Sequence, residues 1–355
     1  MSTWSVEIRN DRALFSELAP WWNECPGPLS IPFLRTEWFE IWTDSFLSRG
    51  SNLEIAVWKH DGEPIAVLPL SRRGLRRSAL ANSQSEVFDV ITSPNTDVAP
   101  TIEEWLAHQP VTRLFRLDGE SLLIPSQPDP NWHVDRQSRA PFIDLGYGME
   151  GVLNGLGRNL IKNLRRLERR TAELGEVVYL DNADGVIPDA LEQCMRLEAS
   201  GWKGRVGTAM ISRPDTARFY EELVGLARDR GWLRICSLLV AERIVAFELD
   251  LDYHGRRFSL KAGYDQELSR LSPGKVLQQR VLEAAVAGGL SSYEFGGEAE
   301  EWKLEWTNSV HPRINVLRFG DRGMSRLLGQ AMRGVAQRRA RSGSSGDQRE
   351  VPNEL

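Results

Sequence analysis

Apolar residues follow two different periods in the first part of this 355-residue chain. Residues 35–48 place Trp38 and Trp42 on one side of a 3.6-residue repeat, which predicts an amphipathic helix. Residues 53–73 instead form two apolar runs around residues 59–63, whose Asp-Gly pair is typical of a tight hairpin turn. The first part of the chain is therefore predicted to be mixed α/β.

A long amphipathic helix is predicted over residues 151–174, after a short strand at 140–145. One face of this helix is apolar and holds Leu160, Leu164, Leu167, Thr171 and Leu174. The opposite face is basic and holds Arg158, Lys162, Arg165, Arg166, Arg169 and Arg170. A basic face is usually only solvated, but this density of charge also suits an anionic substrate or an acidic lipid surface.

The rest of the second part alternates helices with an antiparallel meander. The predicted elements are a strand at 177–181, helices at 186–200, 214–230 and 274–287, meander strands at 232–240, 243–252 and 256–264, and strands at 293–295 and 313–319. The two strands at 53–70 and the two strands at 233–251 share one pattern, an apolar strand, a short charged turn and an apolar strand. This likeness indicates two related domains. We expect domains at 1–139 and 140–320, joined through a Pro- and Ser-rich connection at 121–139. Residues 321–355 are expected to hold a basic amphipathic helix at 324–339 and a disordered tail.

Composition and charge exclude several classes of protein. The formal net charge of −5 argues against nucleic acid as a partner, and there is no apolar run long enough to span a bilayer. The N-terminus lacks the pattern of a signal peptide, so we expect a cytoplasmic protein. The three cysteines form no C-x-x-C pair and are expected to be buried thiols, and the five scattered histidines predict no metal site.

Two glycine-containing segments stand at the start of predicted helices. Residues 146–151 fit G-x-G-x-x-G, but the antiparallel meander that follows does not suit a dinucleotide-binding domain. The second segment is Ser272-Pro273-Gly274-Lys275, which reads either as ordinary helix capping or as a phosphate site at a helix N-terminus. Meander, glycine-containing loop, helix and a strand ending in Gly296-Gly297 form the layout in which two splayed strands admit the pantetheine arm of acyl-CoA.

Four segments together resemble a known family. They are RNLIKNLRRLERRTAELG, EASGWKGRVGTAM, GYDQELSRLSPGKVL and EFGGEAEEWKLEW, at residues 158–175, 198–210, 263–277 and 294–306. In order and spacing they resemble acetyltransferases of the cellulose-biosynthesis-type branch of the GNAT superfamily. These enzymes are related to the Fem aminoacyl transferases, which carry two GNAT-like domains in tandem. The chain departs from this branch at Glu294-Phe295, where Asp-Phe is usual.

The resemblance implies a tandem GNAT-like α/β fold, each domain a mostly antiparallel twisted sheet flanked by helices. It implies transfer of an acyl group, acetyl for preference, from acyl-CoA to an amine, with an amino sugar of surface polysaccharide as the implied acceptor. Ser272, Pro273, Gly274, Lys275, Gly296 and Gly297 would then contact acetyl-CoA. No metal is implied.

The aromatic-lysine pair Trp302-Lys303 matches the pair that lies at the reacting carbonyl in Fem relatives. Lys303 would stabilise the oxyanion, with Glu298 or a neighbour keeping it oriented, unless it is simply a surface lysine with Trp302 in the core. Glu248, Asp250 and Asp252 share one face of a strand, so Glu248 or Asp250 could serve as the base, although a solvated face is the plainer interpretation.

The remaining candidates are substrate contacts and one acid. Tyr264 is the candidate acid for the leaving thiolate, and the expected acceptor contacts are Asp265, Trp202, Lys203, Trp302, Glu298, Arg158 and Lys162. Two alternatives stay open at this stage: a Fem-like transferase that uses aminoacyl-tRNA, and a non-catalytic scaffold at the inner membrane face. The scaffold hypothesis depends on the basic helix face at 158–170 and on the arginine-rich C-terminal helix, since basic amphipathic helices bind anionic lipid surfaces.

Overall fold

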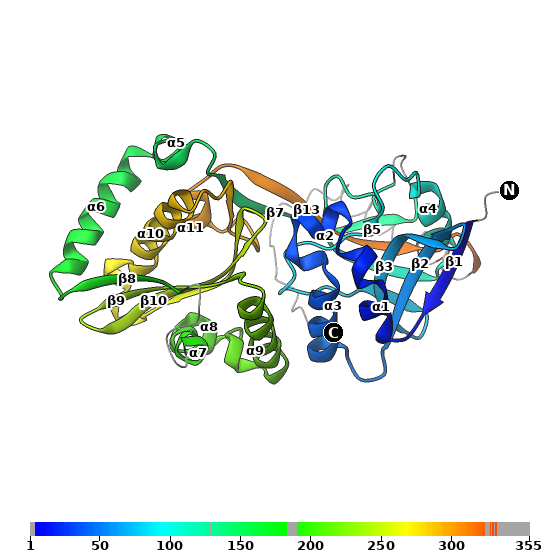
Figure 1. Ribbon diagram of the computed structural model, residues 1–355, viewed down its shortest axis with the longest axis horizontal. Helices are drawn as coiled ribbons and strands as arrows, with labels where there is room; N and C mark the ends of the chain where they lie inside the picture. The colour runs from blue at the N-terminus through cyan, green and yellow to red at the C-terminus, as the bar shows by residue number, and fades with distance from the viewer. Residues whose placement is uncertain are drawn as a thin grey trace.

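The computed structural model describes residues 4–125, 127, 129–182, 190–323, 327, 329 and 331. Their strands hydrogen-bond in one continuous path, β1-β2-β3-β4-β6-β13-β7-β12-β11-β10-β9-β8, with β5 added beside β3. Figure 1 shows this path running through two halves, each with helices against its strands. The expected fold class, mixed α/β with mostly antiparallel sheets flanked by helices, is confirmed.

The first half contains most of the elements before residue 120. They are β1 (Trp4–Arg9), α1 (Ala13–Trp22), α2 (Pro26–Ser30), a 3₁₀ turn (Pro32–Leu34), α3 (Thr36–Phe46), β2 (Asn52–His60), β3 (Glu63–Arg73), β4 (Arg76–Ala79), β5 (Ile91–Thr92), α4 (Ala99–His108) and β6 (Val111–Asp118).

The second half contains the predicted meander and the helices that cover it. Its elements are β7 (Trp132–Asp144), α5 (Gly148–Gly155), α6 (Arg158–Ala172), β8 (Val177–Asn182), α7 (Ala190–Ser200), α8 (Trp202–Arg205), 3₁₀ turn Met210–Ser212, α9 (Pro214–Asp229), β9 (Leu233–Val240), β10 (Arg243–Tyr253), β11 (Arg256–Tyr264), 3₁₀ turn Gln266–Leu271, α10 (Pro273–Ala287), β12 (Ser292–Glu294), α11 (Glu301–Leu304) and β13 (Val310–Phe319).

Tight turns define the hairpins of both halves. Asp61-Gly62 joins β2 to β3, Ala241-Glu242 joins β9 to β10, and His254-Gly255 joins β10 to β11. All six residues have positive φ, between 45° and 89°. Two consecutive positive φ angles match the right-handed twist of the flanking strands, so these short loops fix the register of each hairpin.

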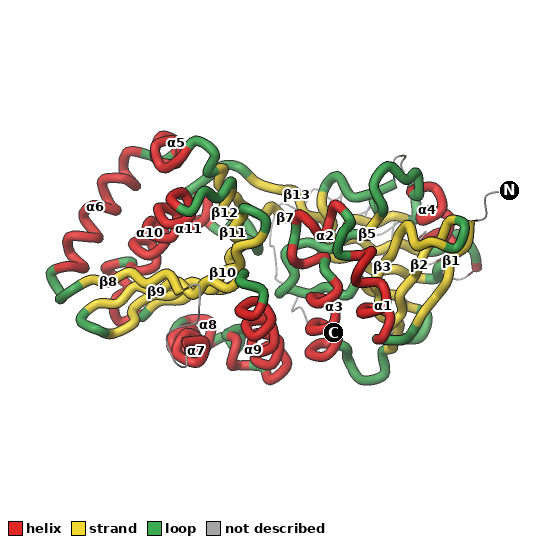
Figure 2. The backbone as a smooth tube through the Cα atoms, viewed as in Figure 1, coloured by secondary structure: helices red, strands yellow, loops and turns green. Residues whose placement is uncertain are grey.

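Two long strands connect the halves. β13, the last described strand, lies antiparallel between β6 of the first half and β7 of the second. The far end of β7 pairs with β12, through Phe142 to Asp144. Figure 2 shows both strands crossing from one half to the other. The two halves are therefore held by backbone hydrogen bonds as well as by side-chain packing.

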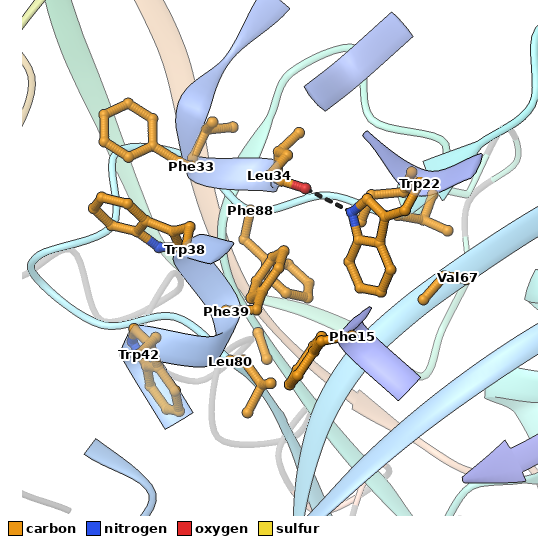
Figure 3. Packing of buried hydrophobic residues seen from close by; sticks show 14 of the residues in the cluster. Phe15, Trp22, Phe33, Leu34, Trp38, Phe39, Trp42, Val67, Leu80 and Phe88 are labelled. Carbon is orange, nitrogen blue, oxygen red and sulfur yellow. Dashed lines mark hydrogen bonds between the residues drawn. The ribbon is translucent and has the colours of Figure 1, made fainter. Parts of the chain in front are cut away.

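An aromatic core fills the first half. Trp22, Phe15 and Phe39 are almost fully buried, and Trp22 donates a 2.7 Å hydrogen bond from Nε1 to the Leu34 carbonyl oxygen (Figure 3). Phe33 extends this core, because its ring meets Phe258 of β11 edge-on with centroids 5.5 Å apart. The hydrophobic packing is thus continuous between the halves.

Helices cover both faces of the second sheet (Figure 1). Leu249 and Leu251 of β10 point to the face covered by α7 and α9, where they join the core of the first half. Cys236, Leu238 and Ala246 point to the other face, where α6 and α10 pack. The three cysteines are buried and free, as predicted.

Several predicted boundaries were wrong. The helix expected over 151–174 is two helices, because the chain is extended at Gly157 and α6 begins anew there. Residues 132–139, read as part of an irregular connection, belong to β7. The helix expected from 186 is described from residue 190, and the one expected at 324–339 lies almost wholly outside the described residues. At the G-x-G-x-x-G segment, α5 has only eight residues and its sheet is antiparallel there, which excludes the dinucleotide-binding interpretation.

Candidate active site

The pairing between β11 and β12 ends soon after it begins. The two strands are parallel neighbours over only three pairs, Arg256 with Ser292 through Phe258 with Glu294. β11 then continues to Tyr264, whereas β12 ends and the chain turns at Gly296 and Gly297. The strands therefore separate at the end of the sheet where α10 starts.

A β-bulge lies in β11 at the same level. Leu249 of β10 faces Lys261 and the next residue, Asp250, faces Ser259, so Leu260 is an extra residue in β11. A bulge leaves its extra residue unpaired and redirects the side chains that follow it. Backbone groups of β11 are thus released from the ladder beside the separated strands.

The first half of the protein holds the glycine turn, Gly296-Gly297. Both residues have φ near +60°, where side chains are strained. A Cβ on Gly296 would lie 2.9 Å from Glu86 Oε2 and 3.1 Å from the Ser259 carbonyl oxygen. Gly297 N–H donates to Glu86 Oε2 at 2.8 Å, and Arg116 Nη2 donates to the Gly297 carbonyl oxygen at 3.1 Å. The absence of side chains on these two glycines therefore lets the Glu86 carboxylate lie close to their backbone.

Glu86 and Arg116 form a largely buried ion pair of their own. Arg116 Nη2 lies 3.1 Å from Glu86 Oε2, and its Nε donates to the Glu86 carbonyl oxygen at 2.8 Å. Arg116 also has φ of +54°, an uncommon conformation for a residue with a side chain. Backbone strain at a buried residue persists only where its surroundings enforce it, so the turn is firmly positioned.

Lys303 is buried against the same turn. Its Nζ donates to the carbonyl oxygens of Gly296 at 2.8 Å and Glu298 at 3.1 Å, and lies 3.2 Å from Glu300 Oε2. Burial lowers the pKa of this ammonium, with Glu300 opposing the shift. The surface-lysine interpretation is excluded.

Glu298 and Trp302 are the two other predicted site residues in the segment around Lys303. Glu298 or a neighbour was expected to orient Lys303. The Glu298 carboxylate lies 3.6 Å from Arg136 and 3.9 Å from Arg116, and only its backbone oxygen contacts the lysine. The carboxylate that pairs with Lys303 is that of Glu300. Trp302 is 39% exposed and donates from Nε1 to Glu300 Oε2 at 3.0 Å, so it is not a core residue.

The start of α10 lies close to this turn. Pro273 stands at the first helical position after Ser272, as the capping interpretation expected, but Ser272 adopts φ of +45° and its side chain makes no capping hydrogen bond. Pro273 and Gly274 begin the helix, and Tyr264 packs beneath Gly274, 3.4 Å from where a Cβ would stand. Lys275 Nζ is paired with Glu305, just after α11. The N–H groups at this half-buried helix start suit a phosphate group.

Glu248 and Asp250 lie in the core beneath α10. Tyr293 donates its hydroxyl to Glu248 Oε2 at 2.8 Å, and the interpretation as a solvated face was wrong because both carboxylates are buried. Burial raises the pKa of Glu248 to about 7. Burial, together with the charge of Glu248, raises the pKa of Asp250 well above its ordinary value.

The remaining predicted contacts fall in three places. Asp265 is buried, pairs with Arg243 and accepts a 2.9 Å hydrogen bond from the Glu267 N–H. Lys203 binds Glu198, while the side chain of Trp202 lies outside the described part of the chain. Arg158 and Lys162 are not brought to the glycine turn.

These two basic residues line a groove of about 470 Å³ on α6. α6 ends beside the start of β8, at the end of the sheet where α10 begins. Fifteen helical residues span roughly 20 Å, so Arg158 lies at the opposite end.

Among the described residues, no group of three His, Cys, Asp or Glu side chains is placed to hold a metal ion. No helix of the described chain is both long and apolar enough to cross a membrane.

The comparisons with known proteins agree with this geometry. The family model of the acetyltransferase (GNAT) domain matches residues 158–304. The matched stretch runs from α6 to α11 and contains the meander, α10, the glycine turn and Lys303. No curated protein matches the chain.

Solved structures share the fold over most of the chain. The C-terminal domain of a putative lysylphosphatidylglycerol synthetase from Agrobacterium fabrum has a TM-score of 0.54 at 12% identity, covering 96% of this chain and 99% of that one. FemX has a TM-score of 0.53 at 11% identity, covering 91% and 100%. A conserved protein of unknown function from Bacteroides thetaiotaomicron has a TM-score of 0.54 at 12% identity, covering 88% of this chain and 100% of that one. Such low identities show the fold alone.

Glu86 and Arg116 were missed by the sequence analysis. They lie about 200 residues before the turn that they hold, and no local motif marks them. Lys261 was also missed, because simple alternation along β11 does not reveal a bulge.

Proposed function

We propose that this protein is an N-acyltransferase that moves an acyl group, acetyl for preference, from acyl-CoA to an amine. The observation that carries the proposal is the separation of β11 from β12 beside the start of α10, within the GNAT-type domain. Separated strands offer unpaired backbone groups to the amides of a pantetheine arm, and the helix start offers N–H groups and a positive dipole to its phosphates.

The residues around the glycine turn would then serve the carbonyl. Attack by the amine nitrogen on the thioester carbonyl carbon places a negative charge on its oxygen. Lys303 Nζ, buried and fixed by two backbone oxygens, is the proposed donor to that oxygen. Lys303 Nζ already has three oxygen partners, two from the backbone and one from Glu300. We therefore propose that it leaves the Glu300 carboxylate when it binds the oxyanion.

Proton transfers complete the reaction. The attacking ammonium must first lose a proton, and Glu248, with a pKa raised to about 7, is the proposed acceptor through the Tyr293 hydroxyl. The C–S bond breaks as the amide forms, and Tyr264, beneath the start of α10, is the proposed donor to the departing thiolate sulfur. An amino-sugar acceptor, and a place in the cellulose-biosynthesis-type branch, rest on the sequence resemblance.

Acetyl-CoA titration tests the donor. We expect saturable binding of acetyl-CoA to the purified protein, and release of free thiol when a panel of amines is added, with the acylated amine identified by mass spectrometry. Neither binding nor thiol release with any amine would remove the proposal.

A second candidate is aminoacyl transfer from aminoacyl-tRNA. It is favoured by the fold shared with FemX and with the lysylphosphatidylglycerol synthetase domain, and by the exposed basic face of α6. Binding of charged tRNA that weakens steeply with salt, without affinity for acetyl-CoA, would support it instead. A membrane contact through residues 324–339 remains a proposal, because that segment lies almost wholly outside the described residues.

A further inference from the structure

Lys261 is a cation without a matching anion at the boundary of the two halves. Its Nζ lies 5.3 Å from the centre of the Tyr220 ring. Among the described residues, none comes within hydrogen-bonding or ion-pairing distance of this ammonium. Burial lowers the pKa of Lys261 to about 8, because a charged amine loses its hydration there.

The bulge in β11 is the reason that Lys261 points this way. Regular alternation would send Ser259 and Lys261 to the same face of the sheet. The extra residue, Leu260, shifts the alternation, so that Lys261 reaches Tyr220 of α9. Three residues later, Tyr264 is back on the face covered by α10.

The other charged groups near Lys261 already have partners. Lys203 Nζ donates to Glu198 Oε1 and to the Ala262 carbonyl oxygen, both at 2.9 Å. The second carboxylate oxygen of Glu198 accepts from the Met210 N–H at 2.7 Å. Lys203 and Glu198 neutralise each other, and Lys261 supplies the surplus positive charge of the cluster.

One loop of the first half connects this cluster to the glycine turn. Gln84 Oε1 accepts a 2.9 Å hydrogen bond from the Tyr220 hydroxyl. Glu86, two residues later, accepts from Gly297. The Cα atoms of two residues so placed lie at most about 7 Å apart, so one short loop contacts both the Lys261 cluster and the glycine turn.

We propose that Lys261 binds an anionic group, a carboxylate or a phosphate, carried by the amine acceptor. The proposal rests on acyl transfer as the function of the neighbouring site. An ammonium in a half-buried place with no anion of its own forms a strong charge-assisted hydrogen bond with such a group. The anion would fix the acceptor beside the glycine turn, with its amine free to reach the carbonyl.

Chemical labelling tests the subsite without any turnover. The full-length protein is treated with an amine-reactive ester at pH 8, and the labelling rate of each lysine is followed by peptide mass spectrometry. We expect inorganic phosphate or acetate, compared with chloride at equal ionic strength, to slow labelling of Lys261 several-fold and to leave Lys59 unchanged. Protection by only one of the two anions identifies the group bound. An unprotected Lys261, or one that the ester cannot reach, would overturn the proposal.

Kinetics with matched acceptors test its role in specificity. The pairs are an amino acid and its primary amide, and a hexosamine and its phosphate ester. We expect kcat/KM to favour the anionic member of one pair by about tenfold, and Lys261→Met to abolish that preference while the neutral member stays within about threefold of wild type. A preference that survives Lys261→Met, or its absence from the wild type, would refute the role. If no amine is acylated at all, the acyl-transfer proposal fails, and the labelling result still decides the subsite.

Discussion

The backbone N–H of Gly297 donates a 2.8 Å hydrogen bond to Oε2 of Glu86, a residue 211 positions earlier in the chain. The same carboxylate pairs with Arg116, which in turn donates to the Gly297 carbonyl oxygen. The turn beside the proposed catalytic lysine is therefore shaped by the first half of the protein. This arrangement makes the first half part of the candidate active site.

Removing the Glu86 carboxylate should destabilise the whole fold. Glu86→Ala leaves the Arg116 guanidinium and the Gly297 N–H without their buried partner, and we expect a loss of about 3 kcal/mol of unfolding free energy. Urea denaturation measures it. Glu7→Ala is the matched control, because Glu7 is an exposed partner of Lys59 and should cost no more than about 1 kcal/mol. Equal losses in the two variants would contradict a structural role for Glu86.

Alanine at Gly296 should cost more than alanine at another glycine of similar φ. Gly255 has φ of +75° and nothing lies within 4 Å of the position that a methyl group would take, so Gly255→Ala tests backbone strain alone, about 1–2 kcal/mol. Gly296→Ala adds a clash with Glu86 and with the Ser259 carbonyl oxygen, worth about 1–3 kcal/mol more. Thermal or urea unfolding of the two variants gives the difference. If Gly296→Ala is no worse than Gly255→Ala, the turn is not held as tightly as described.

Lys303→Met should abolish most of the turnover. Methionine keeps much of the buried volume but removes the ammonium proposed to stabilise the oxyanion, so we expect the single-turnover rate to fall about a hundredfold or more. Binding of acetyl-CoA should change far less. Lys59→Met, in the exposed pair with Glu7, serves as the control and should retain full activity. An unchanged rate in Lys303→Met would remove this residue from the mechanism.

The free energy of unfolding should fall as the pH rises from about 5 towards 7, because of the buried Glu248 carboxyl. Burial raises its pKa in the folded protein to about 7 from an ordinary value of 4.5, so the folded state holds the proton over this range and the unfolded state does not. The stabilisation is complete below the unfolded pKa and is lost as pH rises through the folded pKa.

A single proton corresponds to at most about 1.4 kcal/mol per pH unit. Glu248→Gln keeps an acceptor for the Tyr293 hydroxyl but does not titrate, so urea unfolding of this variant at pH 5, 6, 7 and 8 should show a smaller decline than wild type. Parallel curves for the two proteins would mean that Glu248 titrates normally.

Local patterns predicted most of the second half. The meander strands β9, β10 and β11 follow from apolar runs separated by turn residues, and α9 and α10 follow from helical periodicity with Pro at their first positions. The break at Gly157 was missed, since the apolar residues on either side of it keep helical spacing. Burial of Glu248 and Asp250 was missed for a related reason: alternation shows which residues share a face, and not what covers it.

Local sequence patterns were enough to predict the strands, helices and hairpin turns of the second half, and they brought out Lys303 and the Gly296-Gly297 pair as candidates. These features depend on residues close together in the chain. Their surroundings were visible only in the folded protein: Glu86 and Arg116 hold the glycine turn, and the bulge directs Lys261 towards Tyr220. Such contacts join distant segments through strand pairing and packing, whose energies no local pattern of residues encodes.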